Sequence, residues 1–320
     1  MNIAVSMGAV SLLEFQAFMV MPADAAVSCF FVVSGFIMAM IASKKGNAVD
    51  FLGRRAIRIF PTYWIALLVS SFIPIIIAGV SPLSSWKELL LLKPAGLLPL
   101  TWALVFEIYF YICVFFIMIL FKNRSDYGFA IFCVVHVSLI LLSPGSFVAD
   151  WVFLSSAAAT LWIGSAVFMC LQARRSLIPI VIIALAIIVL LTNLDFSIRG
   201  HQMVLFSTIF APLFLALIKL EQKNRLSVPK ALLWWSERSY SLFLWHLPVM
   251  TLTALLISQT IGFDTIQGSS IYIFATVFLV IAVALVAYRV IELPLTKSLN
   301  ALWKRKRTHS RTTSTVSHPA

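Results

Sequence analysis

The sequence predicts an all-α, polytopic membrane helix bundle of about ten transmembrane helices. Of the 320 residues, 61% are hydrophobic and only 11% are charged, and the mean hydropathy is +1.01. Soluble domains carry about 25% charged residues. Apolar runs of about 20 residues, the length that crosses a bilayer, recur along the whole chain between short polar connections. We therefore expect one integral membrane domain, residues 1–295.

The expected spans follow the apolar runs in order. They cover residues 3–20, 25–43, 59–80, 99–121, 127–143, 151–171, 177–194, 201–219, 239–261 and 270–290. The first run is the weakest, because it contains Glu14 and no basic residue precedes it. A signal peptide is the competing interpretation, since Ala23-Asp24-Ala25 resembles a cleavage site.

The distribution of basic residues predicts the topology. Of the 24 Lys and Arg residues, 21 lie in connections 44–58, 122–126, 172–176 and 219–238 or from residue 289 onward. Loops rich in Lys and Arg are cytoplasmic, so these connections and both termini are predicted to be cytoplasmic. The net charge of +12 is thus explained by topology, and no nucleic acid partner is expected.

Two polar stretches lie outside the spans. Residues 81–98 are apolar on one helical face and contain Lys87 and Glu88, which indicates an interfacial helix on the outer surface. Residues 296–320 are basic and rich in Ser and Thr. We expect them to form a disordered cytoplasmic tail whose basic residues contact membrane lipids.

Ionisable residues inside spans mark candidate sites, because a charge in lipid is costly. Glu107 lies about 12 Å below the outer end of its expected span, and His246 lies about 10 Å from the cytoplasmic end of another. In a hydrocarbon core about 30 Å thick, the two approach similar depths and could share a cavity. For each, a hydrogen bond that fixes helix packing is the alternative. His136 has no motif around it and is interpreted as a packing residue.

Three arginines, Arg54, Arg55 and Arg58, precede the expected span 59–80. Arg55 and Arg58 are three residues apart, so on a helix they project from one face. This arrangement favours a bidentate clamp for phosphate. Anchoring by the positive-inside rule is the alternative, although lysine would serve that purpose equally well. Ser34 and Gly35 could either pack helices closely or line a path for a ligand.

Five short motifs together resemble the acyltransferase 3 family, whose members are bacterial membrane enzymes that O-acylate surface saccharides. In order they are FFVVSGF (30–36), RRAIRIFPTYW (54–64), TWALVFEIYFY (101–111), RSYSLFLWHLPV (238–249) and IELP (291–294). The resemblance covers about residues 25–295. It implies an acyltransferase that transfers groups other than aminoacyl groups, here an O-acetyltransferase.

The resemblance also implies the reaction and its participants. An acetyl or other short acyl group would move from cytosolic acyl-CoA, above all acetyl-CoA, to a hydroxyl of a cell-surface polysaccharide or its lipid-linked precursor. The enzyme would lie in the bacterial inner membrane and would need no bound cofactor or metal. The implied residues are catalytic His246 and Glu107, donor-binding Arg54, Arg55, Arg58, Ser34, Gly35 and Phe36, and acceptor-binding Trp102 and Tyr111.

The N-terminal region departs from the family pattern. Members usually carry a basic residue and, eleven positions later, a His regarded as the general base. Residues 1–28 contain no His, Lys or Arg, and the usual Gly-Val-Asp before FFV reads Ala26-Val27-Ser28. This departure has three alternative interpretations. Either the start codon has been placed downstream of the true one, or the first helix has been replaced, with Glu14 as substitute base, or the chain is inactive. A transporter or flippase of a lipid-linked saccharide is the alternative from another functional class.

Overall fold

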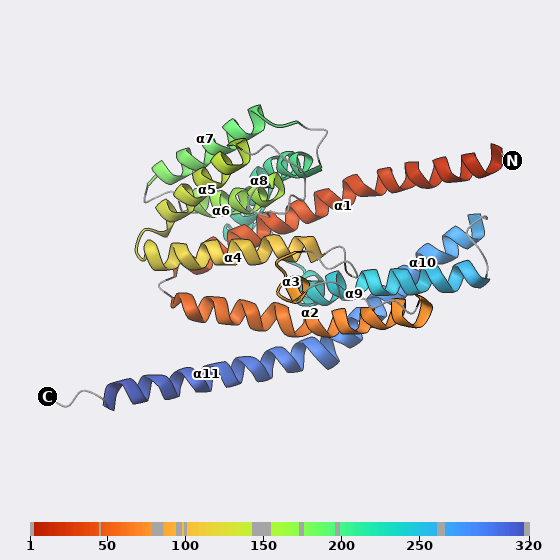
Figure 1. Cartoon of the computed structure of the whole chain (residues 1–320). Coiled ribbons are helices and arrows are strands. Elements are labelled where there is room, and N and C mark those ends of the chain that lie inside the picture. Colours follow the sequence, from red (N-terminus) through yellow and green to blue (C-terminus); the bar gives the residue numbers. More distant parts are fainter. Residues whose placement is uncertain are drawn as a thin grey trace. The chain divides into compact units, whose positions relative to one another are not determined.

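A computed structural model of the chain describes most of its residues. The described backbone covers residues 3–44, 46–78, 86–93, 98, 101–142, 155–172, 176–195, 199–260 and 266–316. Side chains are described over 23–44, 46–72, 86–93, 98, 101–142, 155–172, 176–195, 199–257 and 271–307. The protein is 89% helical, and every element in the described part is a helix (Figure 1). The predicted all-α class is confirmed.

Among the described residues, six helical segments are long and apolar enough to cross a membrane. They are Ala23–Ser43, Trp102–Leu120, Ser125–Leu142, Arg199–Gln222, Lys230–Ile257 and Ile271–Arg307. Two shorter apolar helices cover Ser156–Leu171 and Ile178–Thr192. The chain therefore has the character of a polytopic membrane protein, while the count of ten spans and the cytoplasmic termini remain predictions.

The chain forms two compact units. Unit 1 comprises Met1–Phe51 and Trp102–Ser227, and unit 2 comprises Leu52–Thr101 and Val228–Ala320. The helices of unit 1 are α1 (Ile3–Ser43), α4 (Trp102–Leu120), α5 (Ser125–Leu142), the 3₁₀ helix η3 (Ser156–Ala158), α6 (Ala159–Leu171), α7 (Ile178–Thr192) and α8 (Arg199–Gln222). Unit 2 contains most of α2 (Ala48–Ala78), then α3 (Trp86–Leu89), α9 (Lys230–Thr260), α10 (Ile266–Ala287), the π-helix η4 (Tyr288–Glu292) and α11 (Leu293–Val316).

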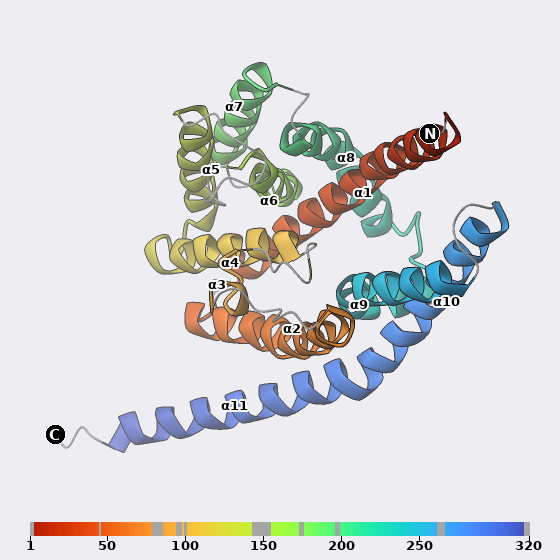
Figure 2. The same cartoon turned by 45° about the vertical axis from the view of Figure 1, so that its right-hand side comes forward.

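Within unit 1, α1 is the central helix, in contact with α4, α6 and α8 (Figure 2). Its crossing with α6 depends on two glycines. A Cβ on Gly35 would collide with the carbonyl oxygen of Leu161, and a Cβ on Gly164 would collide with that of Val32. Small residues let helix backbones approach closely in membrane proteins, so these glycines fix the α1–α6 contact.

Within unit 2, α9 packs along α10. One side-chain contact joins α2 to α9, and another joins α2 to α11. The Tyr240 hydroxyl of α9 donates a hydrogen bond to the Ile59 carbonyl of α2 over 2.8 Å. The indole of Trp303 on α11 lies directly over Gly53, where any Cβ would collide with it. These contacts place the start of α2 beside α9 and α11.

The expected break between spans 3–20 and 25–43 is wrong, because α1 is one helix of 41 residues. Such a helix is about 60 Å long, twice the thickness of a hydrocarbon core. The polar Asp24 falls in the expected break, but it is completely buried and pairs with Arg199. The side chain of Glu14 lies outside the described residues.

The tail also differs from the prediction. Residues 296–316 were expected to be disordered, but they continue α11 as far as Val316. The seating of Trp303 on Gly53 gives this helix a packing contact that the polar composition of the tail did not reveal. Of the expected interfacial helix at 81–98, the described part contains only the single turn α3.

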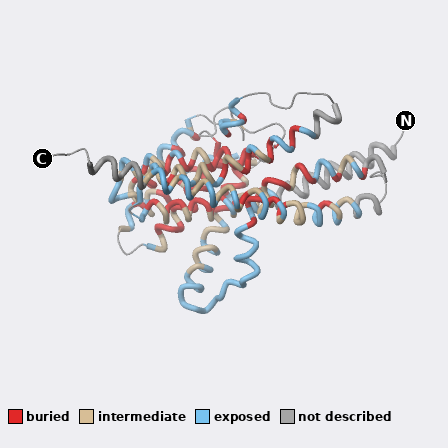
Figure 3. The backbone as a smooth tube through the Cα atoms, turned by 90° about the horizontal axis from the view of Figure 1, so that it is seen from below, coloured by how far each residue is buried: buried red, intermediate tan, exposed pale blue. Residues whose placement is uncertain are grey.

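Exposure varies along the helices. Residues 219–237, at the end of α8 and the start of α9, are exposed throughout, and exposed residues are pale blue in Figure 3. The buried residues of unit 1 include an aromatic cluster in which the ring centroids of Phe110 and Trp162 lie 4.9 Å apart. This cluster supports the middle of α4, which carries the candidate site.

Candidate functional site

The carboxylate of Glu107 is buried inside unit 1 and hydrogen-bonded to Ser34. The Ser34 hydroxyl donates to Oε1 of Glu107 over 2.7 Å, and only 5% of Glu107 is exposed. Helix α4 begins at Trp102 rather than at the expected residue 99, so Glu107 lies about 8 Å from the helix end. The structure thus brings together two residues that the sequence had singled out separately.

This hydroxyl–carboxylate pair has a definite chemical capacity. A carboxylate that accepts a hydrogen bond from a hydroxyl has the geometry of a general base toward that hydroxyl. Hydrogen bonds to charged groups are stronger than neutral ones. Glu107 can therefore either be held in place by Ser34 or accept a proton from a substrate hydroxyl that takes the place of Ser34.

The two residues that follow Ser34 have packing roles. Gly35 faces the backbone of α6. The ring of Phe36 meets Phe168 edge-on at a centroid distance of 5.6 Å and Phe214 at 5.4 Å. Close helix packing explains Gly35 fully, and donor binding by Gly35 and Phe36 stays a prediction.

Trp102 and Tyr111, the expected acceptor-binding residues, flank Glu107 on α4. Trp102 is buried and meets Phe31 edge-on at 6.1 Å. Tyr111 is also buried, with its ring 6.1 Å from that of Phe51. Because Tyr111 follows Glu107 by four residues, the two lie on one helical face. Acceptor binding by these aromatic residues stays a prediction.

The three arginines of unit 2 lie within α2 itself, because that helix begins at Ala48. Arg54 and Arg58 are exposed, and Arg55 is half-buried. Arg54 and Arg58 are four residues apart and share a helical face. Arg54 and Arg58 are therefore the exposed pair on one face, whereas the sequence analysis had paired Arg55 with Arg58.

Behind Arg58 lies a buried carboxylate. Glu292, the last residue of the π-helix, accepts a hydrogen bond from the Ser241 hydroxyl over 2.5 Å. It also interacts electrostatically with Arg58. Single-turn π-helices often occur at functional sites. Glu292 and Ser241 thus form a buried polar pair that interacts with Arg58.

Arg238 is a fourth arginine of unit 2, and it is buried. Its guanidinium lies 3.8 Å from the centre of the Trp234 ring and 4.6 Å from that of Tyr288. It donates to the Trp234 carbonyl, while its Nε has no hydrogen-bond partner among the described residues. Cation–π contacts of this kind hold a guanidinium in one orientation.

His246 lies in the half-buried part of α9. Its Nδ1 is 3.2 Å from the Leu242 carbonyl oxygen of the preceding turn. Glu107 belongs to unit 1 and His246 to unit 2, so their common cavity stays a prediction.

The remaining histidine of the sequence analysis, His136, is buried, and its Nδ1 lies 2.9 Å from the hydroxyl of Tyr109. Its interpretation as a packing residue stays a prediction. Among the residues that the structure describes, no group of three or more His, Cys, Asp or Glu side chains could hold a metal ion.

Comparison with known proteins decides the family. Residues 3–289, nearly the whole chain, match the model of the acyltransferase 3 family, described as an acyltransferase domain. The chain belongs to this family. It is a membrane acyltransferase, as the five motifs implied. No curated protein and no solved structure matches the chain.

Sequence reasoning missed an ion pair of this acyltransferase. Arg199, at the start of α8, pairs with both carboxylate oxygens of Asp24 on α1, and its guanidinium lies 5.6 Å from the centre of the Trp102 ring. Asp24 lies one turn before Ser28, where the family usually has Asp, and Ser28 donates to the Asp24 carbonyl. The absence of the family's Asp at position 28 was therefore a signal to look for an acidic residue one helical turn earlier, at Asp24.

Sequence reasoning also missed Ser241 and Glu292, although both lie in quoted motifs. Ser241 belongs to RSYSLFLWHLPV and Glu292 to IELP. The two residues are 51 positions apart, and the hydrogen bond that joins them is a long-range contact that no local pattern reveals.

Proposed function

We propose that this membrane acyltransferase moves an acetyl or other short acyl group from acyl-CoA to a hydroxyl of a cell-surface polysaccharide or its lipid-linked precursor. It would act in the bacterial inner membrane. The observation that carries the proposal is the buried hydrogen bond from the Ser34 hydroxyl to the Glu107 carboxylate. It supplies a carboxylate already arranged to accept a hydrogen bond from a hydroxyl.

In the proposed reaction, the acceptor hydroxyl replaces Ser34 as the donor to Glu107. The hydroxyl oxygen attacks the thioester carbonyl carbon while its proton passes to the carboxylate. The carbon–sulfur bond then breaks, the thiolate leaves, and a proton returns to it to give free CoA. A positioned general base contributes about 10²–10⁴-fold to such a step. His246 is proposed as a second catalytic group.

The donor side of the proposal rests on the arginines of α2. Phosphate groups are recognised by arginine through paired, charge-assisted hydrogen bonds. Arg54 and Arg58 are exposed on one face, and Glu292 interacts electrostatically with Arg58. We propose that the phosphates of acyl-CoA bind here, with Arg55 as a further contact. Ser34, Gly35 and Phe36 would lie along the path of the acyl chain.

The acceptor side rests on the aromatic residues of α4. Trp102 and Tyr111 flank Glu107, and aromatic rings with a polar group suit the apolar faces and hydroxyls of sugars. Trp102 is held by Phe31 on one side and Arg199 on another. We propose that the saccharide approaches Glu107 from the Trp102 end of α4.

A genetic experiment tests the proposal. Base-labile acetate on the surface polysaccharide is measured in a deletion strain complemented with wild type, Arg54→Ala/Arg58→Ala, or the matched control Arg225→Ala, an exposed arginine between α8 and α9. We expect wild type and the control to restore the acetate and the double variant to fail. Unchanged acetate in the deletion strain would refute the reaction. Accumulation of normally acetylated, unexported precursor would instead indicate a transporter or flippase.

A further inference from the structure

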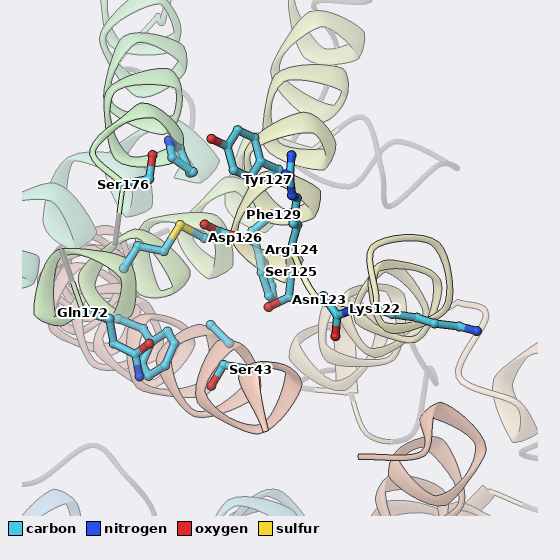
Figure 4. Close-up of a pocket in the computed structure, with 14 residues that line it drawn as sticks. Ser43, Lys122, Asn123, Arg124, Ser125, Asp126, Tyr127, Phe129, Gln172 and Ser176 are labelled. Atoms are coloured by element: carbon cyan, nitrogen blue, oxygen red, sulfur yellow. The ribbon is translucent and has the colours of Figure 1, made fainter. Parts of the chain in front are cut away.

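A cavity of about 320 Å³ lies in unit 1, apart from the Ser34–Glu107 pair (Figure 4). Its walls are the C-terminal ends of α1 and α6, the connection between α4 and α5, and the start of α7. The volume is in the range of small-molecule sites. The acyl-transfer chemistry proposed above does not use this cavity.

The cavity lies where candidate membrane spans end. Ser43 is the last residue of the first candidate span, the second ends at Leu120, and the third begins at Ser125. Ser43 and Ser125 line the cavity. Its opening is therefore at the level of the lipid headgroups, and the basic connection 122–126 is predicted to face the cytoplasm.

Among the described residues, the lining of the cavity carries charges of both signs. Arg124 and Asp126 both line it, and neither forms an ion pair among the described residues. The guanidinium of Arg124 lies 5.9 Å from the centre of the Tyr127 ring. Lys122 lines the cavity as well. A ligand that fits should therefore carry both charges.

The lining also includes apolar side chains, among them Phe168, Met169 and Pro179. Phe168 is the residue on which Phe36 packs. An amphiphile can place its charged head between Arg124 and Asp126 and its apolar part on these side chains.

We propose that this cavity binds the headgroup of a membrane phospholipid that carries a phosphate diester and a primary ammonium, as in phosphatidylethanolamine. Arg124 binds the phosphate. The first backbone amides that bond back to the Arg124 carbonyl are those of Tyr127 and Gly128. The amides of Ser125 and Asp126, which precede them, are left to bind phosphate oxygens.

The carboxylate of Asp126 distinguishes this ligand from other phosphate esters. It would repel a purely anionic head, such as the nucleotide of coenzyme A or phosphatidylglycerol, but it accepts hydrogen bonds from an ammonium group. The proposal goes beyond acyl transfer and does not depend on it.

Native mass spectrometry of the full-length protein in detergent tests the proposal. Wild type, Arg124→Ala, Asp126→Asn and the control Arg225→Ala are titrated with phosphatidylethanolamine and with phosphatidylglycerol. We expect Arg124→Ala to weaken binding of both lipids about tenfold, since a hydrogen-bonded charge is lost. Asp126→Asn should weaken only phosphatidylethanolamine, by a similar factor, and should leave or strengthen phosphatidylglycerol. Arg225→Ala should match wild type.

Two results would overturn the proposal. The first is equal phosphatidylethanolamine binding by wild type, Arg124→Ala and Asp126→Asn, since the cavity would then hold no headgroup. The second is displacement of the bound lipid by added coenzyme A in wild type but not in Arg124→Ala, since the occupant would then be a nucleotide. As a control, thermal unfolding of each variant is measured to check that weak binding does not result from misfolding.

Discussion

Glu107 carries the chemical argument at the scale of single residues. Its burial and its hydrogen bond from Ser34 place a charge-bearing group inside a candidate membrane span, where such groups are rarely kept without a function. Both were predicted as site residues from the sequence, because Glu107 is an acidic residue in an apolar run and Ser34 lies in the motif FFVVSGF. It could not predict their hydrogen bond, because 73 residues separate them.

Replacing Glu107 by Gln should abolish transfer without unfolding the protein. The amide oxygen can still accept the hydrogen bond from Ser34, but it cannot take up a proton at neutral pH. We expect kcat to fall about 10²–10⁴-fold, with the unfolding temperature in detergent nearly unchanged. The matched control is Glu221→Gln, at an exposed position on α8, which should retain full activity. Wild-type kcat in Glu107→Gln would exclude a catalytic role.

The Asp24–Arg199 pair should respond unequally to the loss of either partner. Asp24 is fully buried, whereas the Arg199 side chain is 37% exposed. Arg199→Ala leaves a buried carboxylate unpaired and should lower the free energy of unfolding by about 3–5 kcal/mol. Asp24→Asn leaves an arginine that can still reach water and should cost about 1 kcal/mol. Denaturant titration in detergent measures both values, and equal costs would contradict the asymmetric burial.

At the scale of elements, α4, α5, α7, α8 and α10 agree with the apolar runs to within about four residues, whereas α2 and α9 begin well before the expected spans 59–80 and 239–261. The runs 127–143 and 177–194, for example, correspond to α5 and α7. One error arose where a side chain in one helix satisfies a polar group in another. Asp24 fell between two expected spans, because nothing near it in the sequence indicates that it pairs with Arg199, 175 residues away. Likewise, nothing in the sequence around Gly53 indicates that the Trp303 ring packs against it.

The α1–α6 crossing should not tolerate a methyl group at Gly35. Its Cβ would meet the Leu161 carbonyl, so the two helices would have to separate. We expect Gly35→Ala to lower the free energy of unfolding by about 1–3 kcal/mol. The control Gly46→Ala, whose nearest contact would be an ordinary 3.4 Å, should change it by less than about 0.5 kcal/mol. The same denaturant titration compares the two variants, and an unchanged Gly35→Ala would contradict the close crossing.

The stability of helix α11 against local opening should depend on the packing of Trp303 against Gly53. Trypsin can cleave within the basic run that follows this residue, Lys304 to Arg307. We expect Trp303→Ala to speed cleavage there severalfold, because the helix loses its packing on Gly53 and opens more often. Leu302→Ala, at an exposed neighbouring position, should be cleaved at the wild-type rate. Equal rates for both variants would show that this packing does not hold the helix.

At the scale of the whole molecule, the two units divide the predicted site residues between them. Unit 1 contains Ser34, Glu107, Trp102 and Tyr111, and unit 2 contains the arginines of α2 and His246. The sequence could predict this set because each residue lies in a short motif of the acyltransferase 3 family. The supporting residues, Glu292 above all, could not be predicted, because their role depends on the π-helix and on long-range contacts.

The central claim is that this chain transfers an acyl group from acyl-CoA with Glu107 as the base. Acetyl transfer by inverted inner-membrane vesicles tests it most directly, because acetyl-CoA labelled in the acetyl group then reaches the cytoplasmic face alone. We predict that label enters the saccharide fraction with wild type and Glu221→Gln, and falls at least about 100-fold with Glu107→Gln. Equal labelling by wild type and Glu107→Gln, or none by wild type beside an active family member, would contradict the account.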